Sequence, residues 1–197
     1  MDGEQPRARR RNQATHAAIL RATLELLEQG GYGAATVEGI AARAGVGKQT
    51  IYRWWPSRAA LVMEAYEERV RGRTLEPDTG SLREDVCRSL VHIGGVFHGT
   101  SAGSVVTSLA AEAQHDDDLR RAFREGFMER RRQVMRRTLQ RAELRGELPP
   151  GSDHELLIDL FYGTVLFRAL LSTGPLDRQA VEELVDAVLG PARRPAP

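Results

Sequence analysis

One short stretch, residues 36–58, constrains the fold more strongly than any other part of the chain. It reads TVEGIAARAGVGKQTIYRWWPSR, in which Ile40, Ala41 and Ala44 recur at the spacing of one apolar helix face. Gly45 follows where this helix must end, because glycine adopts the left-handed backbone of a helix C-cap at little cost. The pattern therefore predicts two short helices joined by a tight turn, with the first helix bracing the second.

The second helix of this pair carries polar side chains on its open side. Gly47 occupies the expected N-cap, and Ile51 together with Trp54 or Trp55 is expected to pack back onto the first helix. A helix braced in this way can enter the major groove of DNA, where its side chains reach base edges. The alternative is an ordinary helical hairpin with a glycine corner. It is disfavoured because the apolar positions, the corner and the exposed donors all agree.

Charge is distributed unevenly, although the net charge of the chain is only +1. Residues 1–58 hold nine basic and five acidic side chains, a balance of +4, whereas the remainder holds 19 basic and 22 acidic side chains, a balance of −3. This distribution favours a polyanionic partner for the N-terminal part alone. Residues 1–11 are predicted to form a disordered basic arm, which would either reach DNA phosphates or serve only as a solubilising tail. Lys48, at the start of the second helix, is the only lysine in the chain.

The few cysteines and histidines limit the chemistry that the chain can support. Cys87 is the only cysteine, so no internal disulfide can form and a reducing cytoplasm is expected. A buried inert thiol is favoured over a redox sensor at this position. His92 and His98 lie six positions apart, about 240° around a helix, so they do not share a metal site with His115. We expect neither a metal nor a cofactor.

Hydropathy shows no export or membrane segment. The N-terminus lacks an apolar signal core, and no apolar run approaches the roughly 18 residues that a membrane span needs. The chain is therefore expected to be soluble and cytoplasmic, with no membrane partner.

The remaining sequence shows helical periodicity and no alternating strand pattern, which predicts an all-α fold with roughly nine helices. Ser152 and Glu155 have the spacing of a helix capping box, and Glu76–Gly80 has the composition of a linker. Besides the paired helices, helical segments are expected at residues 12–29, 57–71, 81–98, 104–113, 116–145, 155–171 and 177–189, with a loop at 99–103. The predicted domains are a disordered arm (1–11), a helix-turn-helix DNA-binding domain (12–58), a helical regulatory and dimerisation domain (59–190) and a tail (191–197).

Motifs in both halves of the chain point to one family. The head ends in YRWWPSR at Tyr52–Arg58, and the body carries Arg145–Leu148, Asp153 and the segment 163–171 followed by a Gly-Pro pair. Together these motifs resemble the tetracycline-repressor (TetR-type) family of bacterial transcription regulators. The resemblance implies a three-helix DNA-binding head and a helical body.

The resemblance implies DNA contacts at eight positions. Gln49, Tyr52 and Arg53 resemble positions that face base edges or adjacent phosphates, whereas Trp54 stands where histidine is common. Independently, Arg53 could pair bidentately with guanine and Gln49 with adenine, each worth about 1–3 kcal/mol of discrimination. Gly39 replaces a typical acid and costs about 1 kcal/mol of helix stability relative to alanine. Contacts to backbone phosphates are implied for Thr36, Lys48, Thr50 and Arg58.

The last two helices are expected to form a homodimer interface. The helix at Leu156–Leu171 is apolar around most of its circumference, which one monomer core does not require, although ordinary core packing is the alternative. Because one short helix reads few bases, two heads about 34–36 Å apart, or a multiple of this, would read a palindromic operator. The resemblance implies pairing of these helices as a four-helix bundle. The expected interface residues are Leu156, Leu160, Gly163, Thr164, Phe167, Leu171, Val181, Leu184, Val185 and Val188.

The body is expected to bind a small-molecule effector, as the resemblance implies. The candidate pocket residues are apolar, and residues of this kind more often belong to the ordinary core than to a ligand-binding wall. Gly94 and Gly95 would leave room beside them. The candidates are Val86, Leu90, Ile93, Phe97, Val106, Leu109, Phe123, Phe127 and Phe161.

These features predict a ligand-responsive transcriptional regulator, a repressor that releases its operator when the effector binds. An all-helical interaction adaptor that has lost DNA binding is the alternative. An enzyme is disfavoured because the sequence contains no nucleophile–base pairing, metal-ligand spacing or glycine-rich phosphate loop. Activation in place of repression would leave no trace in the sequence.

Overall fold

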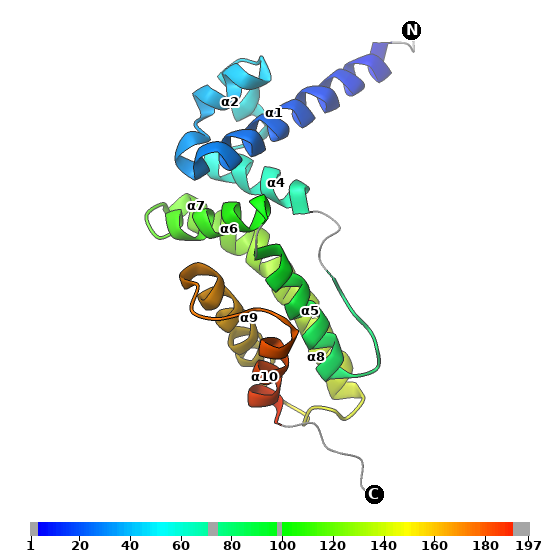
Figure 1. The fold of residues 1–197 in the computed structure, drawn as a ribbon. Coiled ribbons are helices and arrows are strands. Elements are labelled where there is room, and N and C mark those ends of the chain that lie inside the picture. Colours follow the sequence, from blue (N-terminus) through cyan, green and yellow to red (C-terminus); the bar gives the residue numbers. More distant parts are fainter. Residues whose placement is uncertain (1–3, 71–74, 98–99, 191–197) are drawn as a thin grey trace, which may run out of the picture. The chain divides into compact units, whose positions relative to one another are not determined.

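The computed structural model describes residues 4–70, 75–97 and 100–190, and every regular element in these ranges is helical (Figure 1). The run from α7 through the π-helical turns η1 to α8 is continuous, so the described residues form nine helices when it is counted once. The all-α prediction is confirmed. The elements are α1 (Glu4–Ala34), α2 (Val37–Ala44), α3 (Lys48–Trp54), α4 (Arg58–Val70), α5 (Leu82–Phe97), α6 (Ser101–Glu112), α7 (Asp117–Ala122), η1 (Phe123–Met128), α8 (Glu129–Leu144), α9 (His154–Leu171) and α10 (Arg178–Leu189).

The described residues fall into two compact units. The first unit contains α1 to α4, α6 from Ser104 onward, α7 and η1 up to Phe127. The second contains α5, α8, α9 and α10. The DNA-binding helices thus share a compact unit with α6 and α7, which lie far along the chain. The predicted domain limits at 58 and 59 stay a prediction.

Helix α1 starts at Glu4, so the disordered arm predicted for residues 1–11 is wrong from Glu4 onward, while residues 1–3 lie outside the described residues. The reason is that Glu, Gln, Ala and Arg are good helix formers, and extending an existing helix avoids the cost of nucleation. Pro6 is tolerated in a first turn, which needs no donor at that position. The arginine-rich N-terminus is therefore a helical extension of α1.

Helix α1 is broken near its end by two glycines. Gly31 has a φ of 67°, which glycine alone adopts readily, and a Cβ there would lie 2.8 Å from Ser108 Oγ of α6. The break therefore allows α1 to approach α6 closely. It also places Tyr32, which is 3% exposed, inside the first unit.

Four helices enclose the core of the second unit. Leu82, Val86 and Leu90 form the buried stripe of α5, and they pack with Phe161 of α9 and Val185 of α10. Cys87 lies in the same core, and burial raises the pKa of its thiol. The space beside Gly94 is occupied, because a Cβ built there would lie 2.6 Å from Leu176 O. The room predicted beside Gly94 is therefore occupied by the loop that leads into α10.

Two helix starts differ from the prediction. Asp153, and not Ser152, caps α9: its carboxylate accepts from Leu156 N at 3.0 Å, while Glu155 accepts from Arg136 at 2.6 Å. A capping box was therefore wrong, because an adjacent carboxylate competes for the same N–H and Glu155 has a charged partner elsewhere. Helix α6 starts at Ser101, within the predicted loop. The Thr100 hydroxyl accepts from Gly103 N at 3.0 Å at this start.

The segment predicted as a linker is fastened to the second unit. Asp85, fully buried in α5, accepts from Thr79 N at 2.8 Å and from the Thr79 hydroxyl at 2.7 Å. Glu76 accepts from Arg137 at 2.6 Å and from Arg141 at 3.2 Å. The hydrogen bond from Arg137 is the main cause that lowers the pKa of Glu76 to about 2. Residues 76–81 therefore form an ordered strap along α8.

Candidate nucleic-acid interface

The turn between α2 and α3 has the geometry that its sequence predicts. The Thr36 hydroxyl caps α2 by accepting from Gly39 N at 3.1 Å. Gly45 is left-handed, with φ 67° and ψ 36°, and its N–H donates to Ala42 O at 3.3 Å. Gly47 is the N-cap of α3 and provides no side-chain cap. These features end α2 sharply and restart the chain as α3 within three residues.

Apolar contacts brace α3 from behind. Ile51 is buried on the inner side of α3, and Ile40 and Ala41 are buried on α2. Trp55, at the C-cap of α3, is only 2% exposed, whereas Trp54 is half-buried. Of the two tryptophans that could have packed inward, Trp55 is therefore the core residue.

The outer side of α3 presents the predicted DNA-reading residues. Gln49, Tyr52 and Arg53 are exposed and lie three and one positions apart, so they share one helix face. Because this face is free of core contacts, its donors and acceptors can reach base edges without unfolding the head. The other predicted contacts are exposed at Lys48 and half-buried at Thr36, Thr50, Trp54 and Arg58.

Two of the basic residues are held by neighbours within the head. The Lys48 ammonium lies 2.7 Å from Glu38 Oε1 of α2. This hydrogen bond raises the pKa of Lys48 and lowers the pKa of Glu38, so both remain charged at neutral pH. The Arg53 guanidinium lies 5.5 Å from the centroid of the Trp54 ring, within cation–π range. Trp54 thus supports Arg53 in addition to packing.

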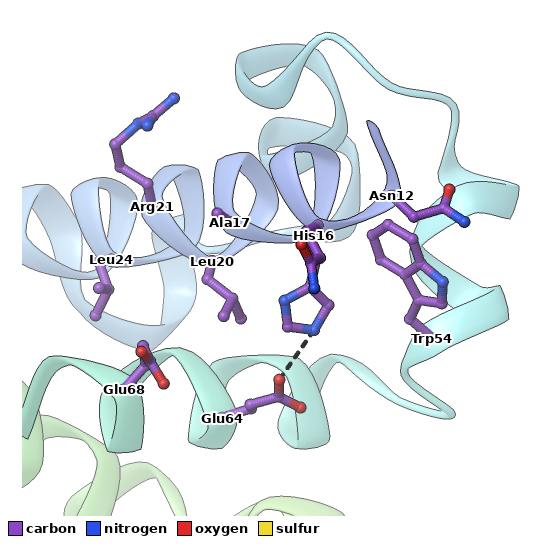
Figure 2. A pocket seen from close by; sticks show the side chains of 10 residues that line it. Asn12, His16, Ala17, Leu20, Arg21, Leu24, Trp54, Glu64 and Glu68 are labelled. Carbon is purple, nitrogen blue, oxygen red and sulfur yellow. Dashed lines mark ion pairs between the residues drawn. The ribbon is translucent and has the colours of Figure 1, made fainter. Parts of the chain in front are cut away.

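A glutamate on α4 ties the end of α3 to α1. Glu64 accepts from the Trp55 indole N–H at 2.8 Å through one oxygen, and His16 Nε2 lies 3.0 Å from the other. The His16 ring stacks on Trp55 with centroids 4.8 Å apart. Figure 2 shows His16 of α1 pointing toward Glu64, with Trp54 beside it. These residues line an open groove of about 1040 Å³. His16 and Glu64 were missed by the sequence analysis; the only available signal was the need of a buried indole for an acceptor.

A second set of contacts surrounds Arg58 at the start of α4. Its guanidinium carbon lies 3.8 Å from the centroid of the Tyr32 ring. The Tyr32 hydroxyl donates to Asp116 Oδ2 at 3.0 Å, and Asp116 Oδ1 caps α7 by accepting from Leu119 N at 2.9 Å. Burial raises the pKa of Tyr32, and the Leu119 N–H lowers the pKa of Asp116, so the donor and the acceptor keep their roles at neutral pH.

The nine candidate pocket residues are divided between the two units. Val106, Leu109, Phe123 and Phe127 belong to the first, where the two phenylalanine rings lie 4.9 Å apart. The other five belong to the second, where three are fully buried and two are half-buried. None of the nine lines the groove of Figure 2. The residues of the second unit are Val86, Leu90, Ile93, Phe97 and Phe161.

The predicted dimer-interface residues differ in how far they are buried. Gly163 and the four large apolar candidates of α9 are exposed, Thr164 is half-buried, and Leu184 and Val188 of α10 are half-buried. Val181 and Val185 lie in the core of the second unit and do not reach its surface. The four exposed candidates of α9 are Leu156, Leu160, Phe167 and Leu171.

The described residues give no sign of a metal centre or a membrane segment. Within them, no three histidine, cysteine, aspartate or glutamate side chains are grouped as metal ligands would be. None of the described helices combines the length and the apolar character that crossing a bilayer requires.

A recognition helix with an exposed polar face, braced through a capped glycine turn, defines a helix-turn-helix DNA-binding protein. Comparison with known families agrees over most of the chain. The profile of the bacterial regulatory proteins of the tetR family matches residues 19–65, and that of the tetracyclin repressor-like C-terminal domain matches residues 76–188. The chain belongs to the tetracycline-repressor family, and it is a DNA-binding transcriptional regulator rather than an enzyme.

Individual relatives cover nearly the whole chain. It is 35% identical over 179 residues to the uncharacterised transcriptional regulator YdeS of Bacillus subtilis, covering 91% of this chain and 90% of YdeS. It is 30% identical to the DNA-binding transcriptional repressor TetR of Mycobacteroides abscessus, covering 91% of this chain and 94% of that protein. The crystal structure of the TetR family regulator SCO0332 superimposes with a TM-score of 0.76 at 35% identity, covering 90% of this chain and 98% of that one.

Proposed function

We propose that this protein is a cytoplasmic repressor that binds a palindromic operator as a homodimer and releases it when a small molecule binds. The observation that carries the proposal is the free outer face of α3, where Gln49, Tyr52 and Arg53 stand on a helix braced by Ile51 and Trp55. Repression is favoured over activation by the similarity to a protein named as a repressor. Ligand response is typical of the family.

The homodimer is supported by the exposed side of α9. Leu156, Leu160, Phe167 and Leu171 are between 44% and 62% exposed, and they follow one another at helical spacing along one face that also includes Gly163. A contiguous apolar stripe of this kind is unusual on the surface of a monomer. Burying it against a second copy would also bring two recognition helices together on one DNA.

Effector binding by the nine candidate pocket residues rests on the family and on their apolar character. Four of them belong to the first compact unit and five to the second. Such an effector must bind one state of the protein more tightly than the other, typically by about 1–3 kcal/mol, to change operator affinity. An interaction adaptor without DNA binding is the competing function.

The test is selection of bound duplexes from a random DNA pool with the full chain, followed by affinity measurements at several salt concentrations. We expect an inverted repeat and an affinity that falls steeply as salt rises. Arg53→Ala should weaken the selected site about tenfold while leaving random DNA unaffected, because a base contact carries the discrimination. Arg21→Ala, an exposed arginine of α1, is the matched control. Absence of salt-dependent DNA binding would establish the adaptor instead.

A further inference from the structure

Arg58 lies against the ring of Tyr32, and both the hydroxyl of this tyrosine and the more distant carboxylate of Asp116 interact with its charge. Its guanidinium carbon lies 3.8 Å from the centroid of the Tyr32 ring, and Tyr32 itself is buried between Gly31 and Gly33. A cation–π contact keeps the positive charge of arginine available, whereas a carboxylate partner would neutralise it. The ring therefore positions the guanidinium without competing with a phosphate for its charge.

Tyr32 is anchored in turn by a residue distant in the sequence. Its hydroxyl donates to Asp116 at 3.0 Å, across 84 positions of the chain. The same carboxylate caps α7 through Leu119 N, so the Asp116 side chain has a partner on each oxygen. The ring cannot turn away from Arg58 without breaking the bond to Asp116. The placement of the Arg58 side chain thus depends on the position of α7 through Tyr32. All of these residues belong to the first compact unit.

We propose that Tyr32 is a positioning residue for DNA binding, whose ring holds Arg58 for a backbone phosphate and whose hydroxyl makes that placement depend on α7 through Asp116. This inference rests on the proposed function. A side chain already held in place loses less conformational entropy when it binds, so the contact raises DNA affinity in the state shown here. A shift of α7 that draws Asp116 away would release Arg58 and weaken the phosphate contact.

The experiment measures the affinity of the full chain for a random-sequence duplex of about three helical turns, as a function of salt. Each phosphate contact adds about 0.9 to the slope of log affinity against log salt, so two heads without Arg58 should lose about 2. Arg58→Ala and Tyr32→Leu should each show this loss, and the double variant should lose no more than either single variant. Simple destabilisation of the head would not produce this equality.

Two further variants test the hydrogen bond between Tyr32 and Asp116 separately. Tyr32→Phe keeps the ring and removes the donor, and Asp116→Ser keeps a hydroxyl that can cap α7 but is too short to reach Tyr32. Each should lower affinity about two- to threefold with the slope retained, and their effects should not add. Asp177→Ser, which changes the same kind of cap on α10, should leave both affinity and slope unchanged. These conservative variants decide the matter even if Tyr32→Leu fails to fold.

The opposing outcomes are distinct. If wild-type protein shows no salt-dependent binding, the proposed function itself fails. If wild type binds but Arg58→Ala keeps its slope, or Tyr32→Leu keeps wild-type slope and affinity, Tyr32 is not a positioning residue. Tighter binding by Tyr32→Leu would show that the ring restrains Arg58 away from DNA, and would overturn the inference. Additive losses in Tyr32→Phe and Asp116→Ser would show that the two residues act separately, and would overturn the link to α7.

Discussion

The indole N–H of Trp55 donates to Glu64 Oε2 at 2.8 Å, which joins the C-cap of α3 to the first half of α4. The other oxygen of Glu64 faces His16 of α1, so one exposed carboxylate connects three helices of the head. The orientation of the recognition helix therefore depends on a polar contact as well as on the apolar brace behind it.

Glu64→Ala should lower the free energy of unfolding by about 1–3 kcal/mol, because the buried indole N–H of Trp55 loses its acceptor. Urea unfolding followed by tryptophan fluorescence measures the change. Glu112→Ala removes an exposed glutamate of α6 in the same compact unit and serves as the control, with a change near zero. Equal stability of the two variants would mean that water replaces Glu64 without loss.

Adjacent glycines of α5 should respond to alanine in opposite directions. At Gly94 a Cβ would lie 2.6 Å from Leu176 O and 2.9 Å from Leu176 Cβ, so Gly94→Ala should destabilise the fold by about 1–3 kcal/mol. At Gly95 nothing lies within 4 Å, and Gly95→Ala should stabilise by about 0.5–1 kcal/mol through helix propensity. Thermal unfolding of both variants checks the pair. A similar loss in both would show that the loop before α10 is not seated on α5.

Acid should weaken the strap along α8. Pairing with Arg137 and Arg141 lowers the pKa of Glu76 from 4.5 to about 2. Because the folded pKa is the lower one, the pairs stabilise the fold fully above about pH 4.5, and this contribution is lost as the pH falls toward 2. Partly exposed pairs of this kind contribute about 0.2–1 kcal/mol each.

The corresponding experiment compares Tm for wild type and Glu76→Gln at several pH values. We expect the variant to be less stable at neutral pH and the difference to shrink as acid protonates Glu76. Glu112→Gln should show no such convergence. A difference between wild type and Glu76→Gln that is constant with pH would contradict the assignment.

Charge on the exposed side of α9 should prevent dimerisation. Phe167→Glu places a carboxylate in the proposed interface, where burying it unpaired is strongly unfavourable, and should give a folded monomer by light scattering. Leu144→Arg changes a residue that is 90% exposed at the end of α8 and should leave the dimer intact. Dimers formed by the Phe167 variant would place the interface elsewhere.

Local sequence signals predicted local structure well. The left-handed Gly45 was confirmed, because a helix C-cap depends on residues within three or four positions. The predicted capping box of α9 was wrong because Ser152 and Asp153 are adjacent acceptors. Which of the two accepts from the helix N–H is decided by the geometry of the folded chain. The choice between Trp54 and Trp55 likewise needed the packing of the whole head.

Contacts between distant segments could not be read from the sequence. Tyr32 lies near the end of α1 and Asp116 is the N-cap of α7, and nothing in their local sequence shows that they meet. The contact between Gly94 and Leu176 could not be predicted either. A small residue in a helix indicates that space is available beside it, but not which residue occupies that space. The exposed apolar face of α9 was easier to predict, because an excess of apolar residues is visible in the sequence itself.

The pairing of Lys48 with Glu38 has a practical consequence. Since the chain has no other lysine, its only side-chain amine stands at the first turn of the recognition helix, exposed and linked to a carboxylate. An amine-selective acylating reagent can therefore report on this single position in the unaltered protein, with the N-terminal amine as an internal reference. Protection of Lys48 by bound duplex would map the contact without any engineered label.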